Sequence, residues 1–243
     1  MAARECHYEA WFYLAVCYEN GCGVEKDIQT AAKWYQKSAE TGNIKAQTKC
    51  GRLFEFGSGV EKNEVLAVEY YKKAADQGDP DAICCLGVCY QYGTGGIRDE
   101  NKAVELYRLA AEKGDSRAKN AIGVCYENGI GAPKDIIAAA AWYQKSAYDG
   151  FVYGQCNLGL CYELGKGVDI NNTEAVRWYR LAADQGNGQA QNNLGSCYEF
   201  GKGVEKDLSE AIKWYRIAAQ NGIEMAKRNL KRMGDTESYT CNR

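Results

Sequence analysis

A period of 36 residues runs through almost the whole chain, and it constrains the fold more than any other feature. A tyrosine, an alanine and a glycine each recur at this spacing in all six copies, and so does a G-x-G pair between Gly21-Gly23 and Gly201-Gly203. The tyrosine column is Tyr35, Tyr71, Tyr107, Tyr143, Tyr179 and Tyr215. A fixed period of this length is typical of a protein built from stacked copies of one small unit.

Each unit is predicted to contain two helices separated by a glycine turn. The first, from about Ala10 to Asn20 in the first copy, repeats apolar residues at the spacing of one helical face. Gly21 and Gly23 end it, because glycine readily adopts the positive φ of a helix C-cap. The second helix follows an Asp or Asn that can accept a backbone N–H as N-cap: Asp27, Asn63, Asp99, Asp135, Asn171 and Asp207.

Alanines and an aromatic pair form a stripe on the second helix, which one helix pair cannot bury alone. The sequence therefore predicts an all-α solenoid that forms a single domain over residues 1–243. Its six repeats cover approximately 8–43, 44–79, 80–115, 116–151, 152–187 and 188–223. A half-repeat at 224–234 is predicted to be a capping helix, and the polar residues 235–243 are predicted to fray.

These columns resemble the Sel-one-like repeat (SLR) family, a relative of the tetratricopeptide repeat. The resemblance covers roughly residues 8–234, with small departures such as Phe54 for tyrosine and Leu106 for tryptophan. It implies a right-handed α/α superhelix whose first helices line the concave side, and a non-enzymatic adaptor or scaffold role. The family pattern is met in full at Ala190, Leu194-Gly195, Tyr198, Gly201, Gly203-Val204, Asp207, Ala211, Trp214-Tyr215, Ala218 and Gly222.

If that geometry applies, three variable columns of the first helices face a groove for a peptide or partner protein. The groove residues expected are Phe12, Val16, Arg52, Phe56, Cys84, Val88, Tyr92, Asn120, Val124, Asn128, Cys156, Leu160, Leu164, Asn192, Ser196 and Phe200. Beside them runs a column that predicts an acidic edge: Glu19, Glu55, Gln91, Glu127, Glu163 and Glu199. Such a groove would suit a partner with apolar anchors and basic residues. In the alternative interpretation, the apolar residues pack against the neighbouring repeat and the glutamates are structural.

Charge and local motifs exclude several other classes of function. The 30 basic and 32 acidic side chains nearly cancel, which argues against a nucleic-acid partner or a polybasic membrane contact. His7 is the single histidine, and no phosphate-binding loop, nucleophile elbow or zinc-protease motif occurs. The sequence therefore predicts no enzyme, no metal site and no cofactor. No signal peptide or membrane span is visible, which predicts a reducing, cytoplasmic compartment.

The cysteines are consistent with that compartment. Five of the 12 share one column, where the second repeat has Leu53, so they are predicted to be small core residues: Cys17, Cys89, Cys125, Cys161 and Cys197. In the secreted, disulfide-rich branch of the resembling family, disulfides tie the two helices of a repeat together, and the second helices here contain no cysteine. Cys84 and Cys85 with Cys89 lack the spacing of a zinc site. A redox or metal-binding protein remains a further alternative.

A second interpretation of the function is a regulatory SLR segment of a larger signalling protein, for example one linked to a kinase. The abrupt start at a first helix motivates it. The expected oligomeric state is a monomer, or a weak end-to-end association, because an uncapped solenoid end can pair with another.

Overall fold

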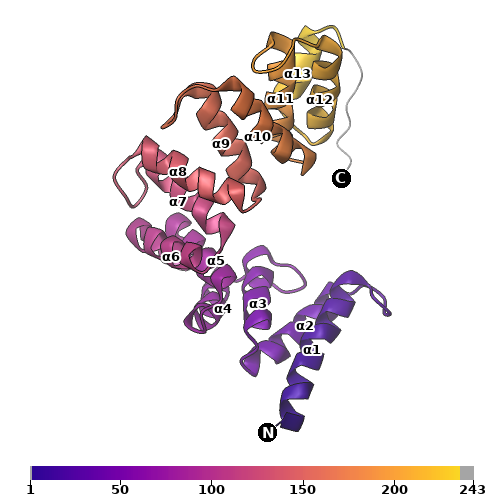
Figure 1. The fold of residues 1–243 in the computed structure, drawn as a ribbon. Helices are drawn as coiled ribbons and strands as arrows, with labels where there is room; N and C mark the ends of the chain where they lie inside the picture. Colours follow the sequence, from indigo (N-terminus) through magenta and orange to yellow (C-terminus); the bar gives the residue numbers. More distant parts are fainter. Residues whose placement is uncertain (1, 236–243) are drawn as a thin grey trace. The chain divides into compact units, whose positions relative to one another are not determined.

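The computed structural model describes residues 2–235, and the side chains from residue 9 onward. Within this range the regular structure is entirely helical, without a strand, and Figure 1 follows the helices in chain order. The helices are α1 (Ala2–Asn20), α2 (Ile28–Glu40), α3 (Ile44–Phe56), α4 (Glu64–Asp76), α5 (Pro80–Tyr92), η1 (Thr94–Gly96), α6 (Glu100–Glu112), α7 (Ser116–Asn128), α8 (Ile136–Tyr148), α9 (Val152–Leu164), α10 (Asn172–Asp184), α11 (Gly188–Phe200), α12 (Leu208–Gln220) and α13 (Glu224–Arg232).

The prediction of two helices per repeat is confirmed. The first helix of each repeat, here called helix A, is α1, α3, α5, α7, α9 or α11, and the second, helix B, is the even-numbered helix that follows. The half-repeat at the C-terminal end forms α13, with Ala226 and Leu230 buried. The tail was predicted to fray over residues 235–243. Of these, residues 236–243 lie outside the described part of the chain.

The chain divides into two compact units, residues 1–118 and 119–243, each considered separately below. In unit 1, α1 to α6 pack in chain order, each helix against the next. In unit 2, α8 to α13 do the same. This sequential packing of neighbours is what the repeat period predicts.

The helix ends follow local sequence chemistry. All six N-caps predicted for helices B accept backbone N–H groups through their side chains, as Asp207 does from Glu210 at 3.0 Å. Helix α3 is capped at its C-terminal end by Gly57, whose φ of 69° is left-handed and whose N–H donates to the carbonyl of Leu53. That conformation suits glycine, which has no Cβ to clash with the backbone.

A second glycine column explains how helices A and B approach each other. A Cβ on Gly123 would lie 2.6 Å from the ring of Tyr143, and one on Gly195 would lie 2.8 Å from the ring of Tyr215. The six tyrosines of the repeat are among the largest fully buried side chains in the described residues. Each ring therefore occupies the space that a side chain on helix A would otherwise need.

Within each unit, the turn between the two helices of a repeat contacts the preceding repeat. A Cβ on Gly59 would collide with the carbonyl oxygen of Ile28 in unit 1, and one on Gly203 with that of Asn172 in unit 2. The second glycine of the G-x-G pair thus lets the turn lie on the first turn of the preceding helix B.

None of the described helices is long and apolar enough to cross a membrane.

Candidate functional site

The third predicted groove column, at the end of each helix A, lies at the surface. Phe56 and Tyr92 in unit 1 are 71% and 72% exposed, and Leu164 and Phe200 in unit 2 are 52% and 58% exposed. Asn128 is exposed as well. The second column is half-buried along its whole length: Val16, Arg52, Val88, Val124, Leu160 and Ser196.

The first column does not line a surface as expected. Cys84, Cys156 and Asn192 are buried, while Phe12 and Asn120 are half-buried. The reason is contact between successive helices A: the Asn229 amide donates to Asn192 Oδ1 at 3.1 Å. The equivalent bond joins Asn157 to Asn120 at 2.9 Å. The expectation that Cys84, Cys156 and Asn192 face the groove is therefore corrected, because all three are buried. Asn192 bonds to the following helix, and Cys156 lies in one core cluster with Ala190 and Leu194 of the next repeat.

The side chains of the glutamate column accept hydrogen bonds from the hydroxyls of the buried tyrosines. Tyr215 donates from its hydroxyl to Glu199 at 2.8 Å, and the same bond occurs in all six repeats, sixteen residues apart each time. In the third repeat the acceptor is Gln91, at 2.8 Å from the hydroxyl of Tyr107. Since an amide serves as well as a carboxylate, the column is needed to accept a hydrogen bond from a buried hydroxyl.

In four of these glutamates, the second carboxylate oxygen forms an ion pair with a lysine or arginine that comes later in the chain. Lys49 pairs with Glu19 at 3.2 Å, and Arg232 with Glu199 at 2.5 Å. The other two pairs are Lys166–Glu127 at 2.6 Å and Lys202–Glu163 at 3.1 Å. The bond from Arg232 holds the pKa of Glu199 below its ordinary value. The predicted acidic edge is thus neutralised within the chain at these positions.

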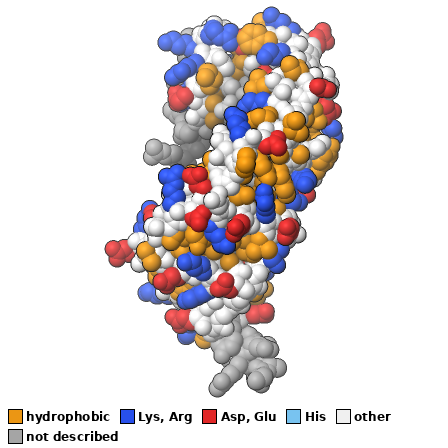
Figure 2. All heavy atoms as spheres, turned by 90° about the vertical axis from the view of Figure 1, so that its left-hand side faces the viewer, with side chains coloured by type: hydrophobic (Ala, Val, Ile, Leu, Met, Phe, Trp, Pro, Cys, Tyr) orange, Lys and Arg blue, Asp and Glu red, His pale blue; other side chains and the backbone are white. Residues whose placement is uncertain are grey.

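An apolar stripe on α9 is the main exposed hydrophobic feature of a helix A in unit 2. Tyr153, Leu160 and Leu164 stand at i, i+7 and i+11, and therefore on one helical face. Tyr153 is 58% exposed and was not among the predicted residues. Its signal was available, because the equivalent positions in the other helices A from α3 to α11 carry Lys45, Asp81, Arg117 and Gln189. Figure 2 shows hydrophobic side chains gathered at the surface between lysine and arginine side chains.

Two cavities lie beside α3 in unit 1. One of about 300 Å³ is lined by Phe12, Lys45, Thr48, Lys49, Arg52, Asp79 and Asp81. The other, of about 330 Å³, is lined by Glu9, Phe12, Tyr13, Gly42, Asn43, Ile44, Lys45 and Gln77. Phe12, Thr48 and Arg52 stand in the predicted groove columns, whereas the other lining residues do not.

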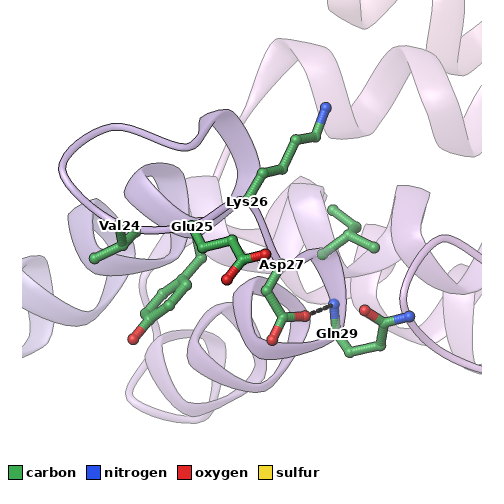
Figure 3. A pocket seen from close by; sticks show the side chains of 7 residues that line it. Val24, Glu25, Lys26, Asp27 and Gln29 are labelled. Atoms are coloured by element: carbon green, nitrogen blue, oxygen red, sulfur yellow. Dashed lines mark hydrogen bonds between the residues drawn. The ribbon is translucent and has the colours of Figure 1, made fainter.

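A larger and more open cavity, of about 890 Å³, lies at the first turn of unit 1 (Figure 3). Of its two carboxylates, Glu25 and Asp27, the second accepts hydrogen bonds from the N–H groups of Gln29 and Thr30 at 3.0 and 3.1 Å. The Thr30 hydroxyl also donates to it at 2.6 Å, and these bonds from Thr30 lower the pKa of Asp27. Lys26 points away from the other side chains of the cavity. Asp27 therefore caps α2, and its oxygens are not directed at a ligand.

The buried cysteines are poorly suited to redox or metal chemistry. Burial raises the pKa of the Cys50 and Cys84 thiols to about 12, and that of Cys85 to about 11. The reactive thiolate is therefore scarce at neutral pH. In the described part of the chain, no group of three or more His, Cys, Asp or Glu residues could hold a metal ion. The side chain of His7 lies outside that part.

With the repeat geometry in place, comparison with known proteins identifies the family: the chain belongs to the Sel1 repeat family. The Sel1 repeat matches residues 9–43, 44–79, 80–115, 116–151, 152–187 and 188–223. This confirms the resemblance drawn from the sequence. Sel1 repeat proteins are generally non-catalytic binding scaffolds.

Solved structures agree with this assignment. A Sel1 repeat protein from Oxalobacter formigenes is 35% identical with a TM-score of 0.81, over 87% of this chain and 84% of that one. A protective antigen present in uropathogenic Escherichia coli strains is 33% identical with a TM-score of 0.77, over 98% of this chain and 51% of that one. An immunity protein from Pseudomonas aeruginosa, 20% identical with a TM-score of 0.63 over 96% and 88% of the two chains, shares the fold.

Among curated proteins, the DAP3-binding cell death enhancer 1 of Rattus norvegicus is 43% identical over 54 residues. That match covers 22% of this chain and 11% of the relative. The match to the mouse protein has the same extent. The matched segment thus spans about a tenth of the length of these curated relatives.

Proposed function

We propose that this chain is a non-enzymatic interaction scaffold that binds a peptide or partner protein on the exposed face of its helices A. The resemblance to the tetratricopeptide repeat implies that this face lies on the concave side. The observation that carries the proposal is the α9 stripe, where the exposed Tyr153 and Leu164 and the half-buried Leu160 share one face. The repeat's own core is closed by buried tyrosines. Grouped, exposed apolar residues are typical of partner surfaces.

The partner is expected to provide apolar anchors. A requirement for basic residues in the partner has less support, because Glu127 and Glu163 beside the stripe are already paired with Lys166 and Lys202. One curated relative carries the name of a protein that it binds, DAP3, which agrees with a protein-binding role. A regulatory SLR segment within a larger signalling protein stays an alternative.

We also propose a reducing, cytoplasmic compartment, a monomer or weak end-to-end self-association, and no nucleic-acid or membrane partner. The support for the compartment is that the ten cysteines the structure describes are free thiols, most of them in the core. Solution mass measurement and thiol counting on protein from its natural source test these points.

The test of the scaffold role is selection of a phage-displayed library of random linear peptides on the full chain. Peptides rich in apolar residues should be enriched, and they should not bind the double variant Tyr153→Ser/Leu164→Ser. Ile137→Ser on α8 is the matched control, because Ile137 is an exposed apolar residue of a helix B in the same unit. Circular dichroism verifies that each variant folds. Enrichment that is unaffected by the double variant would move the site away from α9.

A further inference from the structure

The cavity of about 300 Å³ in unit 1 has a chemistry that the apolar stripe of unit 2 lacks. Lys45, Lys49 and Arg52 stand at i, i+4 and i+7 of α3, so three cations share one helical face along the cavity wall. Phe12 of α1 lines the same cavity. A positively charged wall beside an aromatic ring is suited to a carboxylate with an apolar neighbour.

The basic side chains that line the cavity differ in whether they have an acidic partner. Lys49 pairs with Glu19 at 3.2 Å. Arg52 and Arg117 both donate to the same oxygen of Asp81, each at 2.6 Å. Two guanidinium groups thus share one carboxylate oxygen, while Lys45 has no hydrogen-bond or ion-pair partner among the side chains that the structure describes.

The other carboxylate of the wall, Asp79, is engaged by its own surroundings. It accepts the Thr48 hydroxyl at 2.6 Å and the N–H of Ala82 at 3.2 Å, as the N-cap of α5. The positive end of the α5 dipole further offsets its charge. Among the described residues that line this cavity, the cation without a counter-charge is therefore the ammonium of Lys45.

The adjoining cavity of about 330 Å³ shares Phe12 and Lys45 with the first. It adds Tyr13, which is exposed and whose ring lies edge-on to that of Phe12 at 5.7 Å between centroids. Since open space continues on both sides of Lys45, the site suits a chain that passes through it rather than one that ends there. Glu9 lines only the second cavity, so an acidic group is better placed in the first.

We infer that these two cavities bind an acidic segment of a partner polypeptide, in which an internal Asp or Glu carboxylate pairs with Lys45 and Arg52 while a neighbouring apolar side chain packs on Phe12 and Tyr13. This inference rests on the proposed scaffold function and names a second contact, in unit 1, with its own charge requirement. It predicts that binding depends on ionic strength, because part of it is electrostatic.

The experiment uses the full chain and the phage-displayed library of random linear peptides. Peptides with Asp or Glu beside an apolar residue should be enriched, and synthetic copies should bind the Lys45→Glu variant about tenfold more weakly, as measured by fluorescence anisotropy. Replacing the acidic residue of the peptide by lysine should restore binding to Lys45→Glu and not to the unaltered chain. Lys72→Glu is the matched control, because Lys72 is exposed on α4 and borders neither cavity.

Three results would overturn the inference. Enriched peptides without acidic residues are one, and equal affinity for the Lys45→Glu and Lys72→Glu variants is another. Loss of binding on amidation of the peptide's C-terminus is the third, since it would assign the carboxylate to a chain end. In each case peptides that still require Tyr153 and Leu164 would leave the scaffold function standing, whereas a library without any enriched peptide would contradict both proposals.

Discussion

The hydroxyl of Tyr215 donates a 2.8 Å hydrogen bond to Glu199, and the bond is repeated at the same separation in each of the six repeats. It connects the core of a repeat to the end of its helix A. Because Arg232 binds the same glutamate, the contact also joins one repeat to the next. At four of its six positions, the column that could have served a ligand instead pairs with a cation of the following repeat.

Loss of one tyrosine hydroxyl should cost more where its acceptor is charged. Tyr143→Phe removes the hydroxyl that donates to Oε2 of Glu127, which keeps only its bond from Lys166, and should reduce the free energy of unfolding by about 2 kcal/mol. Tyr107→Phe, opposite Gln91, should cost about 1 kcal/mol. Urea unfolding followed by circular dichroism measures both. Equal losses in the two variants would show that the charge of the acceptor contributes little.

The glycines beneath the tyrosine rings should not tolerate a methyl group. A Cβ on Gly159 would lie 2.7 Å from the ring of Tyr179, so Gly159→Ala should destabilise the chain by about 1–2 kcal/mol despite the better helix propensity of alanine. The first repeat has Ala15 at this position, fully buried, so Ala15→Gly is the reciprocal control and should cost about 1 kcal/mol. Thermal unfolding compares them, and a stabilised Gly159→Ala variant would contradict the packing described.

Acid should weaken the pairing between the last repeat and α13. Arg232 lowers the pKa of Glu199 in the folded chain below its ordinary value of 4.5. The ionised glutamate therefore stabilises the fold above that value, and this contribution is lost as the pH falls through the lower, folded-state pKa. Glu199→Gln should be less stable at neutral pH and lose less stability between neutral pH and about pH 3.

The control for this measurement is Glu205→Gln, on the exposed turn that follows α11. The urea midpoint of this variant should change with pH in the same way as that of the unaltered chain. If the Glu199→Gln and Glu205→Gln profiles coincide, the ion pair with Arg232 does not contribute to stability.

The thiols should separate into two kinetic groups. Cys22 is exposed in the first turn, whereas Cys84 is buried and has a pKa raised to about 12 by that burial. Iodoacetamide should label Cys22 in the folded chain and Cys84 only after unfolding, as resolved by mass spectrometry of the peptides. Labelling of Cys84 at the rate of Cys22 would indicate that α5 opens readily.

The fold could be predicted from the sequence because the 36-residue period indicates both where each helix begins and ends and which helices pack together. The spacing of Tyr35, Gly42 and Asp27 sets the bounds of α2, and its repetition requires neighbours to stack. The role of the Glu column could also have been recognised from Gln91, which keeps the acceptor and discards the charge.

The candidate site was predictable only in part. Exposure at the ends of helices A follows from their position next to the turn, as for Phe56 and Phe200. Burial of Cys156 and Asn192 depends on how closely successive helices A approach, and a column that varies in sequence does not reveal this. The cavities around Lys45 combine residues of α1 and α3 with α5 or with turns between helices, so no single periodic pattern marks them.

The most direct test of the central claim is amide hydrogen exchange of the full chain with and without a library-selected apolar peptide. A partner bound to the face of helices A should slow exchange in α9 and α11, over residues 152–164 and 188–200, and leave α8 and α10 unchanged. Protection confined to α8 and α10, or to the turns alone, would contradict it.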